Sequence, residues 1–225
     1  MELKNKLYKN IGIHVLSTLF TVDKGVVKVL LVKRTNNPYN GYWALPSGAL
    51  YNNELLEVGA KRELKEKTGI DNVNLEMIGV FDKLNRSNLA RMIGISFLGV
   101  IDINKVNIQK ITLKTSNAEY FPIDSIPILA YDHNEVINKS LEILKNKIVK
   151  SDILKELFPK EFTLPELQKV YEALLNKSID RRNFRKKMLS LNIIEDTNKT
   201  KIFEGRKPAK LYKFKNNIID KNVFN

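Results

Sequence analysis

Two glutamates and a lysine stand at helical spacing in a segment without proline between residues 54 and 67. Glu63, Glu66 and Lys67 occupy positions i, i+3 and i+4, so their side chains converge on one face of the expected helix. Carboxylate oxygens arranged in this way can hold a hard divalent cation. Lys67 opposes such a site, because its ammonium group can pair with Glu63 and occupy the space of the cation. We therefore expect at most a weak metal site on Glu63 and Glu66. A simple salt-bridged helix face is the structural alternative.

The residues around this cluster follow a longer pattern, G-x5-E-x7-R-E-L-x-E-x-x-G-I, at Gly48, Glu54, Arg62, Glu63, Leu64, Glu66, Gly69 and Ile70. This pattern resembles the Nudix box, and the resemblance implies an α/β fold, the Nudix-type α/β/α sandwich with a mixed sheet. In Nudix hydrolases an acidic trio holds Mg²⁺ or Mn²⁺, which binds diphosphate oxygens and prepares a water for attack. The resemblance also implies that Arg62 orients a glutamate and that Glu54 supports the site.

This sequence departs from the Nudix pattern at Lys67, which replaces the second of two consecutive glutamates. The box is therefore degenerate at Glu54, Arg62, Glu63, Glu66 and Lys67, and no residue is assigned a catalytic role. Mg²⁺ would be a cofactor only for residual hydrolase activity. A nucleotide-diphosphate pocket with slow or lost turnover would serve as a sensor.

The candidate ligand contacts of this pocket are Arg34, Trp43, Gly48, Arg62 and Glu63. Arg34 could reach a phosphate, and Trp43 could stack on a base or a sugar. Both residues have structural alternatives, since Trp43 could fill the core and Arg34 could hold a carboxylate.

The last 75 residues are distinguished by their excess of basic side chains. Their formal charge is +7, against +6 for the first 150 residues, and residues 177–215 hold thirteen basic and four acidic side chains. Such a local excess attracts a polyanion, although a solvated surface is the alternative. Thr163 and Glu166 form a capping-box pattern with Pro165 in the first turn, which predicts a helix to about Leu175.

A short turn, 176–179, separates that helix from a second one, which Asp180 would cap. Phe184, Met188 and Leu191 form its apolar stripe, which leaves its arginines to point outward. The segments 193–197 and 211–214 read as strands around a basic wing, 198–210. This order is typical of a winged helix-turn-helix. The predicted DNA contacts are Thr163, Arg181, Arg182, Asn183, Arg185, Lys186, Arg206, Lys207 and Lys210.

The elements that must position these residues fall into two domains. Strands are expected at 11–20, 26–32, 75–81, 92–101 and 120–123, with a hairpin turn at 23–25 and helices at 54–67 and from Asp132 to Ile148. We predict a Nudix-like ligand-binding domain at 1–150 and a DNA-binding domain at 151–225. The helix from Asp132 would run close to the second domain and could couple the two.

Composition narrows the function further. The 225 residues include no cysteine, which excludes disulfides, thiolate zinc sites and a cysteine nucleophile. No apolar run is long enough for a membrane span, and the first residues do not resemble a secretory signal, so we expect a cytoplasmic protein with no membrane partner.

The order of the two domains is similar to that of the Nudix-related transcriptional regulators of the NrtR type. The segments 162–173 and 180–187 resemble the DNA-binding part of this family. The resemblance implies a homodimer on a palindromic DNA operator and a repressor that responds to ADP-ribose or a related nucleotide or sugar effector. Two alternatives remain open at this stage, an active Mg²⁺-dependent Nudix pyrophosphohydrolase and an RNA-associated Nudix protein. The sequence identifies neither the effector nor the operator, nor whether the effector releases DNA.

Overall fold

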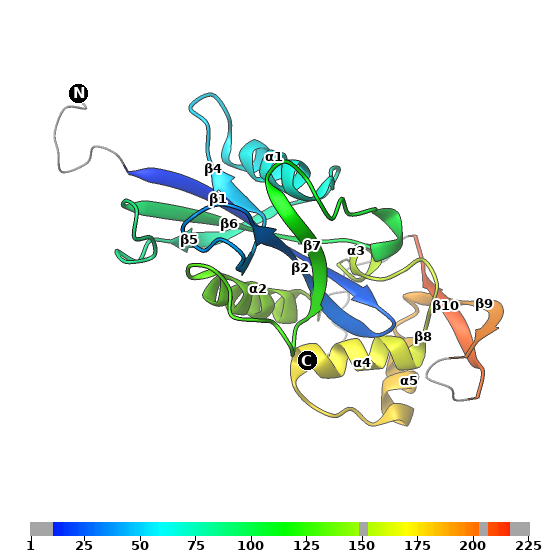
Figure 1. The fold of residues 1–225 in the computed structure, drawn as a ribbon. Coiled ribbons are helices and arrows are strands. Elements are labelled where there is room, and N and C mark those ends of the chain that lie inside the picture. Colours follow the sequence, from blue (N-terminus) through cyan, green and yellow to red (C-terminus); the bar gives the residue numbers. More distant parts are fainter. Residues whose placement is uncertain (1–10, 149–152, 203–206, 217–225) are drawn as a thin grey trace.

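The computed structural model describes residues 11–148, 153–202 and 207–216 (Figure 1). Its first part contains β1 (Gly12–Asp23), β2 (Val26–Arg34), β3 (Trp43–Ala44), β4 (Ser47–Ala49), α1 (Leu56–Thr68), β5 (Glu76–Phe81), β6 (Met92–Val100), the 3₁₀ helix η1 (Ile103–Lys105), β7 (Thr115–Pro122) and α2 (His133–Ile148). Its second part contains α3 (Leu154–Leu157), β8 (Phe162–Thr163), α4 (Leu164–Leu175), α5 (Arg181–Ser190), β9 (Ile194–Lys201) and β10 (Ala209–Phe214).

A seven-stranded mixed sheet is built around β1. The strand order is β3-β2-β1-β6-β5, with β4 paired to β1 and β7 paired to β2. β1 runs parallel to β6 and antiparallel to β2 and β4. The predicted hairpin turn is present, and Lys24 and Gly25 both have positive φ (50° and 78°), as a two-residue turn between twisted strands requires.

The sheet buries apolar side chains on both of its faces. On one face α1 packs Ala60 and Leu64 against a cluster that includes Leu19 of β1 and Leu30 of β2. On the other face Val136 and Ile137 of α2 belong to a second cluster. The helices α1 and α2 therefore cover opposite faces (Figure 1), which confirms the predicted α/β/α sandwich.

The second part has the predicted order of a winged helix-turn-helix. Thr163 and Glu166 form a complete capping box at the start of α4, and the Asp180 carboxylate accepts a hydrogen bond from the backbone N–H of Asn183 at the start of α5. The three strands are arranged in the order β8-β10-β9. Strand β8 was not expected, and β9 extends to Lys201, so the wing is shorter than the 198–210 loop read from the sequence.

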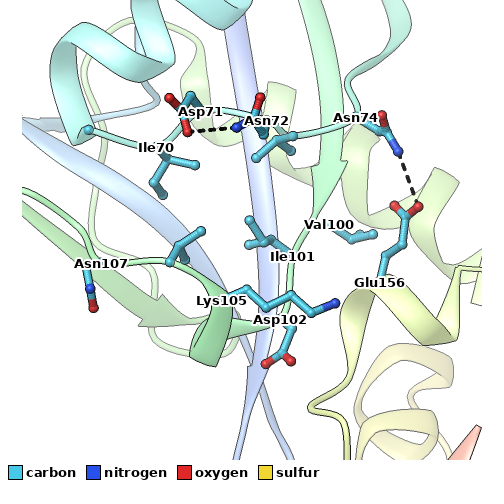
Figure 2. Close-up of a pocket in the computed structure, with 13 residues that line it drawn as sticks. Ile70, Asp71, Asn72, Asn74, Val100, Ile101, Asp102, Lys105, Asn107 and Glu156 are labelled. Carbon is cyan, nitrogen blue, oxygen red and sulfur yellow. Dashed lines mark hydrogen bonds between the residues drawn. The ribbon is translucent and has the colours of Figure 1, made fainter.

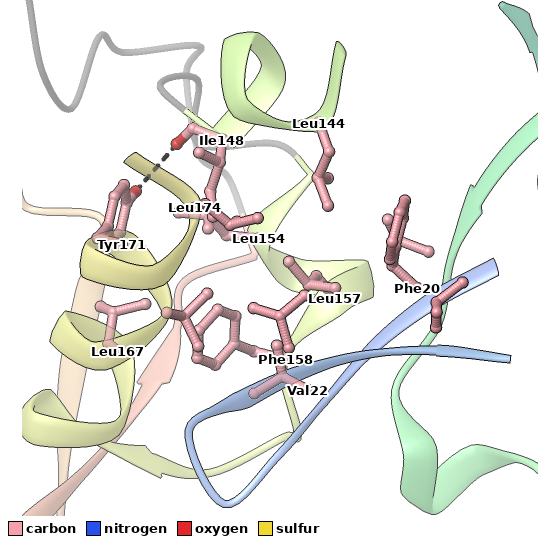
Figure 3. Packing of buried hydrophobic residues seen from close by; sticks show 14 of the residues in the cluster. Phe20, Val22, Leu144, Ile148, Leu154, Leu157, Phe158, Leu167, Tyr171 and Leu174 are labelled. Atoms are coloured by element: carbon pink, nitrogen blue, oxygen red, sulfur yellow. Dashed lines mark hydrogen bonds between the residues drawn. The ribbon is translucent and has the colours of Figure 1, made fainter. Parts of the chain in front are cut away.

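The two parts share one apolar core (Figure 3). Phe20 and Val22 of the β1–β2 hairpin, Phe158 and Leu167 of the winged helix, and Leu144 of α2 all belong to the same buried cluster. The hydroxyl of Tyr171 on α4 also donates a hydrogen bond to the carbonyl of Ile148 at the end of α2 (3.1 Å). Helix α2 thus lies beside the winged helix, as expected, and the packing is continuous across the two parts.

The predicted cap of α2 has a different role. Asp132 precedes the helix, but its carboxylate forms a two-pronged ion pair with Arg86, at 2.8 and 2.9 Å, and both side chains are buried. This pair fixes the loop between β5 and β6 against the start of α2. No helix among the described residues is long and apolar enough to cross a membrane.

Candidate ligand pocket and nucleic-acid interface

The Nudix-box segment places Glu63 directly over the backbone of Gly48. A Cβ atom at position 48 would lie 2.1 Å from the carboxylate carbon of Glu63, so any larger residue there would displace this carboxylate from its ion pairs. Helix α1 ends at Gly69, whose φ of 74° is the left-handed conformation of a helix C-cap. Gly48 therefore allows β4 to approach α1 closely, and Gly69 allows the left-handed backbone conformation that ends α1.

Arg62 is the centre of an ion-pair network in this segment. Its guanidinium donates to both oxygens of Glu54 (2.6 and 2.8 Å) and to Oε1 of Glu63 (2.5 Å). It also donates to the carbonyl of Ala49 (2.9 Å) and lies 3.7 Å from the centre of the Tyr51 ring. The hydrogen bonds from Arg62 lower the pKa of Glu54 to about 2. Arg62 thus holds the loop before α1 against the helix.

Two lysines surround the carboxylates that would bind a metal. Lys67 pairs with Oε2 of Glu63 (3.3 Å) and donates to the carbonyl of Ser47, so the pair predicted from the sequence is present. Lys114, which precedes β7, pairs with Glu66 (2.5 Å) and lies 3.7 Å from Glu63. Burial by itself would raise the pKa of Glu63, but Lys67, Arg62 and Lys114 hold that pKa below its ordinary value. Burial lowers the pKa of Lys67, and Glu63 opposes this shift.

These contacts do not suit a Mg²⁺ site. Both oxygens of Glu63 already face cationic groups, and Glu66 is bound by Lys114. In the described ranges, no group of three or more His, Asp or Glu side chains is placed to hold a metal ion. A cation bound between Glu63 and Glu66 would have to displace the ammonium groups that neutralise them.

A hollow of about 300 Å³ opens beside this network, between the end of β2, the β3–β4 segment and α1. Its charged lining residues are Arg34, Lys67, Lys114 and Glu63, a net excess of two positive charges. Arg34 donates to the carbonyls of Pro38 (2.9 and 3.2 Å) and Asn36 (3.3 Å), so backbone groups rather than a carboxylate hold it. The hollow has the sign and position expected for an anionic ligand.

The structure brings only part of the predicted ligand set to this hollow. Arg34, Gly48 and Glu63 line it, and Arg62 supports it from behind Glu63. Trp43 is not among the lining residues; its ring packs edge-on against Phe121, with 4.7 Å between ring centres, and joins the apolar core. Lys114 and Tyr51 line the hollow but were missed. Tyr51 occupies a position of the box where the pattern specifies no residue type, and no motif marks the sequence around Lys114.

A larger hollow of about 430 Å³ lies near the junction with the winged helix (Figure 2). Asn74 donates a hydrogen bond to Glu156 of α3 at its rim (3.3 Å). Asp71, Asp102 and Glu156 outweigh Lys105 in its lining, so its net charge is negative. A phosphate-bearing ligand would therefore favour the smaller hollow, although it is not the larger of the two.

Helix α5 presents the predicted DNA-binding side chains to solvent. Arg181, Arg182, Asn183, Arg185 and Lys186 are all exposed, while Phe184 and Met188 are buried beneath them. Among the described residues, the ion pairs of the winged helix use lysines of the strands, and none uses a cation of α5. The arginines are therefore available to an external anion.

The wing continues this basic surface. A groove of about 330 Å³ lies between the start of α4, the start of α5 and β10 with the residues before it. Its charged lining residues are Arg181, Arg185, Lys207 and Lys210, with no carboxylate in its described lining. Lys207 is exposed, whereas Lys210 pairs with Asp196 (2.7 Å). Arg206 lies outside the described residues. Thr163 is fully buried as the cap of α4, so its side chain is not exposed on this surface, although the next two residues, Leu164 and Pro165, line the groove.

Comparisons with known proteins match both parts of the chain. Residues 13–141 match the NUDIX domain family, and residues 154–214 match the NrtR DNA-binding winged helix domain. The chain is 32% identical over 200 residues to the ADPR responsive transcriptional repressor NtrR of Acinetobacter baylyi, covering 87% of this chain and 79% of that protein.

Solved structures of NrtR from Shewanella oneidensis have the same architecture. The protein alone is 30% identical with a TM-score of 0.72, covering 91% of this chain and 94% of that one. Its complex with a 27mer DNA is 29% identical with a TM-score of 0.69, covering 90% and 93%. Its Nudix domain with ADP ribose is 27% identical with a TM-score of 0.57, covering 63% and 93%. The chain therefore belongs to the Nudix-related transcriptional regulators, which join a Nudix domain to an NrtR-type winged helix.

Proposed function

We propose that this chain is a DNA-binding transcriptional repressor that responds to ADP-ribose. The winged helix binds operator DNA through Arg182, Arg185 and the cations of the wing, and the hollow beside the Nudix box binds the effector. The observation that carries the proposal is the pairing of an exposed, uncompensated basic helix with a positively charged pocket in one molecule. The names of the relatives, a repressor responsive to ADPR and structures with DNA and with ADP ribose, support this assignment.

Strand β2 offers a route between the two sites. Its last residue, Arg34, lines the pocket, while Val27, Val29 and Leu31 belong to the core that also contains Leu167 of α4. A ligand that draws Arg34 toward a phosphate would favour one position of β2, and the packed core would transmit that preference to α4. Effector binding would thereby change how well the winged helix fits DNA.

The repressor is proposed to act as a homodimer on a palindromic operator, with half-sites separated by about one helical turn. Ligand binding would change the placement of the two winged helices relative to each other. Analytical ultracentrifugation of the protein with and without operator DNA tests this proposal. A single protomer bound per operator would contradict it.

Fluorescence anisotropy with DNA from the region upstream of the gene tests the main proposal. We expect binding that weakens steeply with salt, because basic side chains release counterions from the phosphates, and that changes when ADP-ribose is added. Binding indifferent to ADP-ribose would keep the regulator but reject this effector. Equal competition by duplex RNA of the same sequence would favour the RNA-associated alternative.

The alternative of an active pyrophosphohydrolase is favoured by one observation, the retention of Glu63 and Glu66 in the box. The ion pairs of both carboxylates with Arg62, Lys67 and Lys114 oppose it. Mg²⁺-dependent cleavage of ADP-ribose that disappears in the Glu66→Gln variant would establish the enzyme. Stable ADP-ribose over the time of a binding experiment would reject it.

A further inference from the structure

The positive charge of the pocket comes from side chains of the protein. Three cationic side chains, Arg34, Lys67 and Lys114, line the hollow beside the single carboxylate of Glu63. The lining therefore has an excess of positive charge, which is the sign that a diphosphate ester requires. Glu63 adds little repulsion, because Arg62, Lys67 and Lys114 already neutralise it.

Lys67 stands where the Nudix pattern has a metal-binding glutamate, and its ammonium group is held in place. The carbonyl of Ser47 and Oε2 of Glu63 fix it on two sides, and the side chain is only 14% exposed. A fixed ammonium group in a sheltered pocket gives a phosphate oxygen both a positive charge and a hydrogen-bond donor. Lys67 can therefore supply the charge that a cation bound to glutamate would otherwise supply.

Lys114, which directly precedes β7, completes this arrangement from a different element. Its ammonium group lies 3.7 Å from Oε1 of Glu63, whereas that of Lys67 lies 3.3 Å from Oε2, so the two lysines flank one carboxylate. The side chain of Lys114 is 42% exposed, and its close partner, Glu66, is 36% exposed. An exposed pair of this kind is weak, so Lys114 can leave Glu66 for a phosphate at little cost.

From these contacts we infer that the pocket binds the diphosphate group of a nucleoside diphosphate without a metal ion, with Lys67 and Lys114 in place of the divalent cation. The inference rests on the proposed function for the identity of the site, but it concerns how the site recognises the diphosphate. It also explains why the box can lose a metal-binding glutamate and keep the rest of its structure. The remaining carboxylates position lysines instead of a metal.

Calorimetric titration of the full chain with ADP-ribose, and separately with ADP, in excess EDTA and in excess MgCl₂ tests the inference. We expect the affinity in the two buffers to agree within about twofold. Binding only in MgCl₂ would overturn the inference and leave the proposed function intact. Binding of ADP but not ADP-ribose would reject the proposed effector and keep the inference. Binding of neither ligand in either buffer would reject both.

Variants of three lysines, two that line the pocket and one that does not, sharpen this test. Lys67→Met and Lys114→Met should each weaken binding in EDTA by about tenfold or more, since each removes a charged hydrogen-bond donor to the ligand. Lys61 forms an equivalent i,i+4 pair with Glu57 at 2.6 Å, but outside the pocket, so Lys61→Met should leave the affinity unchanged. Circular dichroism confirms that each variant is folded, and Lys114→Met, at an exposed position, keeps the test valid if Lys67→Met is not.

The variant Lys67→Glu separates a charge role from a purely structural one. It places a third carboxylate beside Glu63 and Glu66, the arrangement that a divalent cation requires. We expect binding in EDTA to be lost and binding in MgCl₂ to be recovered at least in part. Unchanged binding in EDTA would show that Lys67 does not contact the ligand.

Discussion

The molecule has two basic regions, the pocket and helix α5, and they differ in whether their cationic side chains form ion pairs. At the pocket, Lys67 and Lys114 in its lining and Arg62 behind it are all paired with glutamates of α1 or of the loop before it. On α5, Arg182 and Arg185 face solvent, and no described carboxylate forms an ion pair with them. Paired cations build a small, shaped site and leave only a slight excess of charge. Unpaired cations on a helix face suit a long polyanion, whose many phosphates supply the missing partners.

Because of this difference, cations of the two regions should contribute differently to the stability of the protein. A cation paired inside the fold contributes to the stability of the protein, because its removal leaves a carboxylate without a partner in a sheltered place. An exposed cation without a partner contributes almost nothing to stability. The same substitution, a basic residue to alanine, should therefore have opposite consequences in the two regions.

The largest expected effect is that of Arg62→Ala on stability. Arg62 is 18% exposed, and it is the cation that pairs with both oxygens of Glu54, whose side chain is 8% exposed, so the variant leaves a sheltered carboxylate without its charge partner. We expect the free energy of unfolding, measured with urea, to fall by about 3 kcal/mol or more. Lys61→Ala, which breaks an exposed pair on the same helix, should change it by less than about 0.5 kcal/mol. Equal losses in the two variants would show that the ion pairs of Arg62 contribute no more to stability than an exposed pair does.

The reverse pattern is expected for Arg185→Ala on α5. Its guanidinium is exposed and lines the groove between α5 and the wing, so its removal should leave the urea midpoint unchanged. The affinity for operator DNA should fall by about 1–3 kcal/mol, the usual range for one specific arginine contact. Lys139→Ala, an exposed cation on α2 outside the winged helix, is the matched control. Intact DNA binding in Arg185→Ala would show that α5 is not the recognition helix.

Two histidines near the pocket give stability a dependence on pH. Burial and Arg86 lower the pKa of His133 to about 3 and that of His14 to about 4, from an ordinary value near 6.5. The unfolded chain binds these protons at higher pH than the folded chain does. Stability is therefore complete above pH 6.5 and falls as the pH drops toward 4.

The expected slope is about 1.4 kcal/mol per pH unit for each histidine, measured by urea unfolding between these limits. In His133→Asn, the side-chain oxygen can still accept the hydrogen bond that His133 Nδ1 receives from the N–H of Leu45 (3.0 Å). This variant should lose about half of the slope. A slope that is unchanged would show that His133 titrates normally in the folded protein. The core around His133 would then be more accessible to water than its 2% exposure indicates.

Much of the fold could be predicted from local signals in the sequence. Gly69 ends α1, the Thr163–Glu166 capping box starts α4, and Asp180 caps α5, because caps and turns depend on residues that are neighbours along the chain. The pair of Lys67 with Glu63 followed from helical spacing in the same way. These features need no knowledge of the tertiary structure.

The missed features depend on contacts between distant segments. β7 begins at Thr115 rather than near Tyr120, because its pairing with β2 determines its length, and this pairing brings Lys114 to the pocket. Trp43 has an aromatic partner, Phe121, 78 positions away in the sequence. The capping box predicted where α4 begins, but it could not show that the β1–β2 hairpin is one of the packing partners of this helix.

The smallest predicted effect compares a paired with an unpaired lysine within the wing. Lys207 is exposed, whereas Lys210 forms an ion pair with Asp196 at 2.7 Å. Lys207→Ala should weaken binding to all DNA sequences alike and reduce the slope of log affinity against log salt by about 1. Lys210→Ala should reduce this slope less, because a lysine already neutralised by Asp196 displaces fewer counterions from DNA. Anisotropy titrations across a salt series measure both slopes. If both substitutions reduce the slope equally, DNA binding must break the ion pair between Lys210 and Asp196. Ion pairing would then distinguish the pocket from the winged helix only when no DNA is bound.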